Sequence, residues 1–302
     1  MHQEHPYQID YTCHQDHSKH KTIHFMSPAD GTEQTVEVYY PEGDITENIP
    51  LVIGPHPITW KAEEEYCGGP VYLYKQGHCG YYGLADRFRV IIALPHGHHH
   101  AVENCSLGNP AQIKDLGHLP DILITEGFPI DKRRVYIIGN SMGGQEALLT
   151  AGQYPDRITA CVASNPVIDL AMWYSDLKNG NDPEINKFKT WDLISNEVGG
   201  TPEELPEEYN KRSAFTLIDQ IKNVPSMIFW SDYDRIVPHQ KEHQSYRFYQ
   251  ELKRKYPTAP ISEFNHSHTH GVPEQNLAKA GYEIHEWSDY ELYIQWCLRW
   301  IK

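Results

Sequence analysis

Long apolar runs are missing from this sequence. No stretch approaches the ~18 consecutive apolar residues that a membrane-spanning helix requires, and the beginning, MHQEHPYQID, lacks the basic-then-apolar pattern of a signal peptide. Cys-x-x-Cys pairs are absent too, and the six cysteines are scattered, which favours free thiols over a disulfide scaffold. We therefore expect a cytoplasmic protein with no membrane partner.

Basic charge is also scarce. Lys and Arg total 26 against 41 Asp and Glu, which gives a formal net charge of -15. Nucleic acids and anionic membrane surfaces are bound by clustered Lys and Arg, so this balance argues against both as partners. A neutral or cationic small molecule is a more compatible substrate. The sequence leaves the oligomeric state open.

The apolar residues that are present form short, widely spaced runs. Seven of these have strand length: residues 35–40, 51–53, 90–94, 135–138, 160–163, 227–230 and 261–264. Several are apolar throughout, which is typical of strands buried on both faces of a parallel sheet. Helical patterns lie between them, at 143–153 and 241–255, and Tyr290, Ile294, Cys297 and Ile301 follow helical spacing at the end. This alternation predicts an α/β fold with a mostly parallel central sheet flanked by helices, in one domain over residues 1–302.

Two segments depart from the alternation. The runs KTIHFM and TVEVYY are joined by SPADGTEQ, whose Asp-Gly predicts an antiparallel hairpin at the sheet edge. Residues 171–223 contain no convincing strand and carry abundant charge and several aromatic residues. Because the segment is too long for a plain loop, we expect a helical insertion that forms a lid or cap, with a solvated excursion of no function as the alternative.

The segment VYIIGNSMGG places a serine between a strand and a helix. Gly139, Ser141 and Gly143 fit the pattern Gly-x-Ser-x-Gly. In such an elbow the serine backbone is strained, and a side chain at either glycine would collide with neighbouring backbone. The hydroxyl then projects near the positive end of the helix. We predict that Ser141 is a nucleophile rather than a structural turn serine.

A serine hydroxyl is a weak nucleophile and requires a histidine base that an acid orients, in the chain order Ser, Asp, His. Asp232 and Asp234 follow the strand SMIFW. We favour Asp234, because the loop must turn away from the strand before a carboxylate can face the histidine, and Asp232 remains the alternative. His266, His268 and His270 follow the strand ISEF. We favour His270, since the glycine after it lets the loop turn into the site, and His268 is the alternative.

The reaction also needs an oxyanion hole. The backbone N-H of Met142, directly after the nucleophile, is the first expected donor. The second donor should come from the loop GPHPITW, in which Pro55 and Pro57 have no N-H. The N-H of Ile58 or Thr59 must therefore supply it.

Two groups of histidines invite a metal site. The first, His14, His17, His20 and His24, has no clear helical face, so we expect no metal there. The second, PHGHHH, follows the strand VIIAL and should lie at the same sheet edge as the triad. It either lines the substrate pocket through His98, holds a metal, or is an exposed polar loop. Trp60 and Trp173 are further candidates for the pocket wall, and the chemistry requires neither a metal nor a cofactor.

From about residue 35 onward the sequence resembles an α/β-hydrolase-fold serine hydrolase. More narrowly, PIDKRRVYIIGNSMGG, EELPEEYNKRSAF, NVPSMIFWSDYDRIVPHQ and HTHGVP resemble the catalytic domain of the prolyl-oligopeptidase family and the related dienelactone-hydrolase-like esterases. The resemblance implies that Asp234, before the Val-Pro turn, and His270, before a small residue, complete the triad.

Three features depart from that pattern. The 302 residues leave no room for the propeller that restricts many of those peptidases to oligopeptides, GPHPITW replaces a glycine-rich oxyanion loop, and Asn140 precedes the nucleophile. We therefore expect a serine esterase, a carboxylesterase that cleaves a small-molecule ester through an acyl-enzyme. An aminopeptidase or amidase with the same triad is the alternative, and a non-catalytic binding protein of the same fold is a third possibility.

Overall fold

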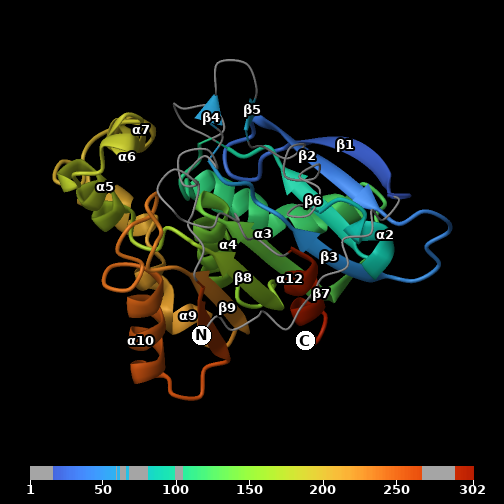
Figure 1. Cartoon of the computed structure of the whole chain (residues 1–302). Coiled ribbons are helices and arrows are strands. Elements are labelled where there is room, and N and C mark those ends of the chain that lie inside the picture. Colours follow the sequence, from blue (N-terminus) through green and yellow to red (C-terminus); the bar gives the residue numbers. More distant parts are fainter. Residues whose placement is uncertain (1–15, 59, 62–65, 68–80, 99–104, 267–289) are drawn as a thin grey trace.

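An eight-stranded sheet forms the centre of the molecule, and helices cover both of its faces (Figure 1). The computed structural model describes residues 16–58, 60–61, 66–67, 81–98, 105–266 and 290–302. The strand order is β1-β2-β6-β3-β7-β8-β9-β10. The strand β2 is antiparallel to both of its neighbours, and every pair from β6 to β10 is parallel. The predicted mostly parallel sheet is confirmed.

All seven apolar runs are strands, as predicted. The strands of the sheet are β1 (Lys19–Met26), β2 (Glu33–Tyr40), β3 (Ile49–Ile53), β6 (Ile91–Pro95), β7 (Ile130–Asn140), β8 (Ala160–Ser164), β9 (Ser226–Trp230) and β10 (Ile261–Asn265). Every residue of β3, β6, β8 and β9 is buried. Strands covered on both faces bury the side chains of both pleats, which is why these runs read as continuously apolar.

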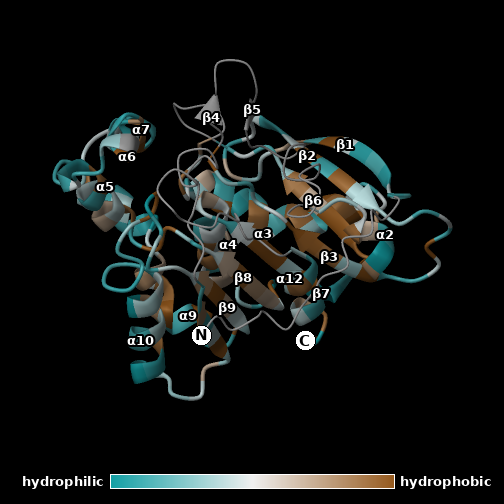
Figure 2. Ribbon diagram, in the orientation of Figure 1, coloured by the Kyte–Doolittle hydropathy of each residue, from teal (hydrophilic) through white to brown (hydrophobic). Residues whose placement is uncertain are grey.

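Helices flank the sheet and fill the segment between β8 and β9. They are α2 (Leu84–Phe88), α3 (Pro110–Thr125), α4 (Met142–Gln153), α5 (Leu170–Asn179), α6 (Pro183–Asn186), α7 (Thr190–Val198), α8 (Pro206–Lys211), the 3-10 helix η2 (Ala214–Leu217), α9 (Ile218–Ile221), α10 (Ser245–Lys255) and α12 (Tyr290–Cys297). One apolar cluster joins the sheet to α3, α4 and α10, and a second joins its other face to α2 and α12. Figure 2 shows the same division, with apolar residues concentrated on the strands. Within the described residues, no helix is long and apolar enough to cross a membrane, and cytoplasmic location stays a prediction.

Two helix boundaries differ from the prediction. The helix α10 begins at Ser245 rather than at residue 241, because buried polar side chains hold the preceding residues in a turn: Ser245 Oγ donates to Gln240 Oε1 at 2.5 Å, and Gln244 Oε1 accepts the N-H groups of Ile168 and Asp169. At the end of the chain, α12 stops at Cys297, and Ile301 lies beyond it, 59% exposed. The helical spacing of Ile301 was therefore misleading.

The predicted edge hairpin is confirmed. The strands β1 and β2 pair antiparallel from Lys19 opposite Tyr40 to Met26 opposite Glu33. The N-H of Ser27 donates to the Thr32 carbonyl at 2.7 Å, and Gly31 has φ 77°, a conformation that a glycine adopts without strain. The hairpin places the 27–32 turn beside α3, where Ser27 Oγ donates to Asp115 Oδ1 at 2.6 Å.

The segment between β8 and β9 contains α5 to α9, and Figure 1 shows α5, α6 and α7 grouped beyond one end of the sheet. Polar contacts attach this segment to the loop after β9. Arg235 forms a two-bond ion pair with Asp182 at 2.6 Å, His243 Nδ1 lies 2.8 Å from Asp176, and Trp173 Nε1 donates to the Ile236 carbonyl at 2.7 Å. The role of residues 171–223 as a lid, and the single-domain description, stay predictions.

Candidate active site

Ser141 occupies the turn between β7 and α4. Its φ of 58° and ψ of -123° lie outside the ordinary regions for a residue with a side chain. The Ser141 N-H donates to the Ser164 carbonyl at 2.8 Å, which ties the turn to the neighbouring strand β8. Strain of this kind persists only where the surrounding structure enforces it, and it is a feature of functional sites.

The glycines on either side of Ser141 allow the turn to be this tight. A Cβ on Gly139 would lie 2.1 Å from the Gly143 carbonyl oxygen, and a Cβ on Gly143 would lie 2.1 Å from the Pro55 carbonyl oxygen. Both distances are far below van der Waals contact, and the atoms involved are backbone. The elbow predicted from Gly-x-Ser-x-Gly has the expected geometry, with β7, α4 and the loop after β3 in direct contact.

We expect Gly143→Ala to destabilise the protein by more than about 4 kcal/mol. Position 143 lies in a helix, where the intrinsic helix propensity favours alanine over glycine by about 1 kcal/mol. Any loss of unfolding free energy in this variant therefore comes from the collision with Pro55. Gly127→Ala is the matched control: Gly127 has φ 92° and open space around it, which predicts a cost of about 1–2 kcal/mol. Urea unfolding of the two variants measures the difference, and equal losses would contradict the close approach at Pro55.

The expected oxyanion donors lie on two segments that pack together. Met142 is the first residue of α4, and Ile58 belongs to the same buried apolar cluster. The side chain of His56 anchors the loop between β3 and Ile58, because its ring nitrogens lie 2.6 Å from the Pro57 carbonyl and 2.9 Å from the His96 carbonyl. Burial lowers the pKa of His56. Thr59 lies outside the described residues, and the donor roles stay predictions.

Asp234 and Asp232 have different surroundings. Asp234 is buried, and its Oδ1 accepts the N-H groups of Ile236 at 3.0 Å and Val237 at 2.8 Å. Gln240 Nε2 approaches Asp234 Oδ2 at 3.4 Å. Asp232 is exposed and accepts from Asn265 Nδ2 at 2.9 Å. The carboxylate of Asp234 is buried and fixed by two backbone N-H groups, so it suits the orientation of a histidine better than the exposed carboxylate of Asp232.

His268 and His270 lie outside the described residues, so the choice of base stays a prediction. His266, the first of the three histidines, follows β10, and its N-H donates to the Trp230 carbonyl at 2.8 Å. Its Nε2 lies 3.1 Å from Asn165 Oδ1, and Asn165 comes directly after the strand beside Ser141. The histidine loop therefore begins at the same sheet edge as the serine and the aspartate.

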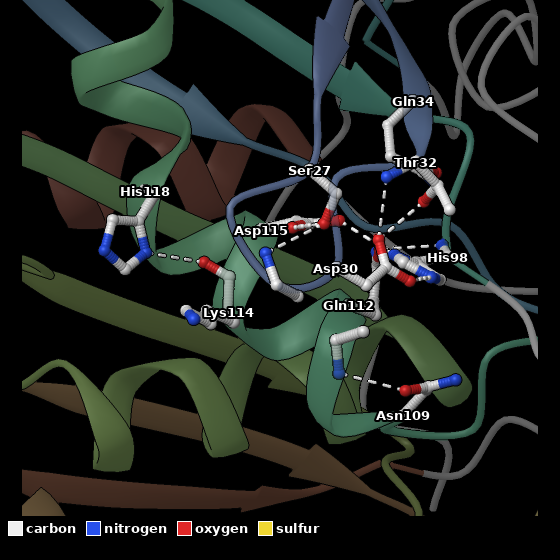
Figure 3. A network of polar contacts seen from close by, with 12 residues as sticks. Ser27, Asp30, Thr32, Gln34, His98, Asn109, Gln112, Lys114, Asp115 and His118 are labelled. Atoms are coloured by element: carbon white, nitrogen blue, oxygen red, sulfur yellow. Dashed lines mark hydrogen bonds and ion pairs between the residues drawn. The ribbon is translucent and has the colours of Figure 1, made fainter.

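His98 takes part in a polar network between the hairpin turn and α3 (Figure 3). Its Nδ1 lies 3.0 Å from Asp115 and its Nε2 lies 3.1 Å from Asp30, while its N-H donates to Gln112 Oε1 at 2.8 Å. The pKa of Asp30 is lowered, chiefly by its bonds to Thr32, with a smaller contribution from His98. Both ring nitrogens thus face carboxylates, so the predicted contact of His98 with substrate has no support in this geometry.

Of the two tryptophans predicted for the pocket wall, the structure describes the side chain of Trp173 and only the backbone of Trp60. Trp60 begins β4 (Trp60–Lys61), which pairs with β5 (Tyr66–Cys67), and its side chain is outside the described part. Trp173 is fully buried in α5, with its indole bonded to the loop after β9. Trp173 therefore supports that loop from within the protein, which gives no support to the predicted contact with substrate.

One histidine from each predicted cluster meets at Glu37. His20 Nε2 lies 2.6 Å and His96 Nε2 lies 2.8 Å from its carboxylate, and Thr22 Oγ1 donates to it at 2.7 Å. Burial opposes the charge, but these partners together hold the pKa of Glu37 below its ordinary value. Among the described residues, no group of three or more His, Cys, Asp or Glu side chains is placed to hold a metal ion. Cys105, Cys161 and Cys297 are free and buried.

Glu146 is a buried ionisable residue that the sequence patterns did not identify. It lies on α4, five residues after Ser141, and is the only charged residue of that helix. It is 1% exposed, and α4 is buried all round from Met142 to Gly152 rather than on one side. A lone charge in an otherwise uncharged helix was the available signal, because a carboxylate in such a place requires partners.

The sheet, the flanking helices and the strained serine elbow define an α/β-hydrolase. The profile of the Prolyl oligopeptidase family matches residues 107–295. The chain belongs to this family.

Known relatives agree with this class. The chain is 29% identical over 110 residues to the acetyl esterase Axe7A of Xylanibacter ruminicola, covering 36% of this chain and 22% of that protein. It is 31% identical over 140 residues to the acylamino-acid-releasing enzyme of Rattus norvegicus, covering 45% of this chain and 18% of that enzyme. The chain thus spans about a fifth of the length of both.

Among solved structures, an S-formylglutathione hydrolase from Agrobacterium tumefaciens superposes with a TM-score of 0.59 at 14% identity. The match covers 94% of this chain and 96% of that one, and the likeness concerns the fold.

Proposed function

We propose that this protein is a carboxylesterase that cleaves a small-molecule ester through an acyl-enzyme intermediate. The observation that carries the proposal is the strained conformation of Ser141, with φ 58°, in a turn that admits only glycine on either side. The acetyl esterase among the relatives supports an ester as the substrate. No cofactor enters this chemistry, because the serine itself is the nucleophile.

In the proposed reaction Ser141 Oγ attacks the acyl carbonyl while His270 accepts the hydroxyl proton. The N-H groups of Met142 and Ile58 stabilise the oxyanion, and collapse of the tetrahedral intermediate expels the alcohol, which takes the proton from His270. Water then takes the place of the alcohol and attacks the acyl-enzyme while His270 accepts a proton from it. The second tetrahedral intermediate collapses, releases the carboxylic acid and returns the proton to Ser141 Oγ. Asp234 holds the tautomer and orientation of His270. The two backbone N-H bonds on Asp234 Oδ1 support this role, since they fix the direction of the carboxylate.

Amide cleavage is the second candidate function. The family match and the acylamino-acid-releasing relative favour it. The same triad would serve, and the difference lies in the leaving group, because an amine must be protonated before it departs whereas an activated alcohol leaves readily. The two functions therefore separate in a matched substrate pair.

We expect p-nitrophenyl acetate to be cleaved at least about 100-fold faster than p-nitroacetanilide, in kcat/KM, by the purified protein. The Ser141→Ala variant supplies the blank rate for both substrates. Comparable rates on the two substrates would favour the peptidase or amidase function. Cleavage of neither would contradict the esterase proposal.

A further inference from the structure

The carboxylate of Glu146, on the helix α4 that follows the nucleophile, is buried against α3 and the loop that precedes α3. Ser106 Oγ donates to its Oε1, Gln112 Nε2 donates to its Oε2 at 3.2 Å, and the Gly108 N-H also donates to the carboxylate. Burial raises the pKa of Glu146 to about 7, although these donors and the charge of Arg212 oppose the rise. The carboxyl group therefore changes charge in the range where a serine hydrolase operates.

Ser106 connects this carboxyl group to the residue that follows the nucleophile. Its Oγ lies 3.7 Å from Met142 Sδ, and the N-H of the next residue, Leu107, donates to the same sulfur at 3.3 Å. A serine hydroxyl has one hydrogen, so it can donate either to Glu146 or to Met142 at any moment. The protonation state of Glu146 decides between the two.

We propose that Glu146 is a positioning residue for the oxyanion donor at Met142, and that it acts through the Ser106 hydroxyl, which switches its hydrogen between Glu146 and the Met142 sulfur. The inference rests on the proposed function, in which the Met142 N-H holds the oxyanion. When Glu146 is ionised, it accepts the Ser106 hydrogen, and Met142 Sδ is held by the Leu107 N-H alone. When Glu146 is neutral, its own O-H donates to Ser106 Oγ, and the Ser106 hydrogen turns to Met142.

Other ionisable groups surround this switch. Arg212, at the end of α8, donates through Nη1 to the carbonyls of Ser106 at 3.0 Å and Leu107 at 3.3 Å, which fixes the segment that bears the switch. Burial lowers the pKa of Arg212 and raises the pKa of Cys105 well above its ordinary value. The negative charge of Glu197, on α7, raises the pKa of both groups. Cys105 therefore stays a neutral thiol, and Arg212 keeps its charge because guanidinium does not deprotonate in proteins. Of Glu146, Cys105 and Arg212, it is Glu146 whose pKa lies near neutral.

The test follows the methyl group of Met142 directly. The chain has five methionines, so selective 13C labelling of their methyl groups gives a simple NMR spectrum, and Met142→Leu identifies the Met142 signal. In the wild type we expect its chemical shift to titrate with a midpoint near pH 7. In Glu146→Gln we expect no such titration and a shift equal to the low-pH wild-type value, because the amide N-H donates to Ser106 Oγ as the neutral acid does.

Two further variants complete the test. Ser106→Ala removes the link and should also abolish the titration of Met142, whereas Glu207→Gln, an exposed residue of α8, should leave it unchanged. A Met142 signal that titrates in Glu146→Gln as it does in the wild type would overturn the proposal, and so would a wild-type signal that does not titrate. These readings need no turnover, so they distinguish a failure of this inference from a failure of the proposed esterase function.

Steady-state kinetics give a second readout. We expect the ratio of kcat in Glu146→Gln to kcat in the wild type to be close to one at pH 6 and to rise about two- to fivefold at pH 8, with KM unchanged. The separation of kcat from KM is expected because an oxyanion contact is stronger in the transition state than in the ground state. A ratio that is constant with pH would assign Glu146 a structural role only.

Discussion

Ser141→Ala lowers kcat for ester hydrolysis by at least about 10⁴-fold while the protein stays folded. The expected loss is large because the hydroxyl forms the covalent bond, and the remaining groups supply only binding and oxyanion stabilisation. The fold is expected to survive, since alanine replaces serine in the same strained backbone with no larger side chain. Steady-state kinetics and far-UV circular dichroism measure the two effects.

Ser164→Ala is the matched control for this variant. Ser164 is fully buried at the end of the neighbouring strand, and its Oγ has no hydrogen-bond partner among the described residues. Its backbone carbonyl, which accepts the Ser141 N-H, is unchanged by the substitution. We expect kcat within about twofold of the wild type, because no paired hydroxyl is removed. Equal activity losses in Ser141→Ala and Ser164→Ala would show that the elbow matters only for structure.

Asp234→Asn lowers kcat by about 10³–10⁴-fold, and Asp232→Asn leaves it within about twofold of the wild type. An asparagine at position 234 keeps the shape of the side chain, but it presents an amide that cannot stabilise the imidazolium or hold the correct tautomer. Asp232 is exposed, and its carboxylate accepts a hydrogen bond from Asn265 across the loop. The pair of variants separates the two candidates for the acid.

The reverse pattern in these two variants would assign the acid to Asp232. Large losses in both would point to disruption of the loop after β9, which thermal unfolding detects: Asp234 accepts two backbone N-H groups there, and an asparagine oxygen can still accept them. We therefore expect a small change in Tm for Asp234→Asn. A loss of activity without loss of stability is the outcome that supports the orienting role.

Much of the fold could be predicted because its signals are local. A strand covered on both faces is mostly apolar, and β3, β6, β8 and β9 are buried along their whole length and apolar except for Ser164 and Ser226 at the strand ends. The elbow could be predicted for a different reason. Only glycine fits at positions 139 and 143, so the two glycines themselves indicate the tight turn.

Features that depend on distant partners could not be predicted. His98 was a candidate for the substrate pocket because of its place after β6, but Asp30 and Asp115, from a hairpin turn and a helix, occupy its ring nitrogens. Trp173, from the aromatic-rich segment 171–223, was another candidate, but its indole N-H donates to the Ile236 carbonyl in the loop after β9. In both cases the direction of the side chain depends on tertiary contacts that the local sequence does not reveal. The choice between His268 and His270 stays open for the same reason.

The most direct measurement is covalent trapping of the nucleophile. Incubation of the wild-type protein with a fluorophosphonate, followed by intact-mass and peptide mass spectrometry, reports which residue reacts, since such reagents phosphonylate an activated serine. We predict one adduct per chain, located on Ser141 and absent from Ser141→Ala. An unmodified protein that is nevertheless active on p-nitrophenyl acetate, or an adduct on another residue that persists in Ser141→Ala, would contradict Ser141 as the nucleophile.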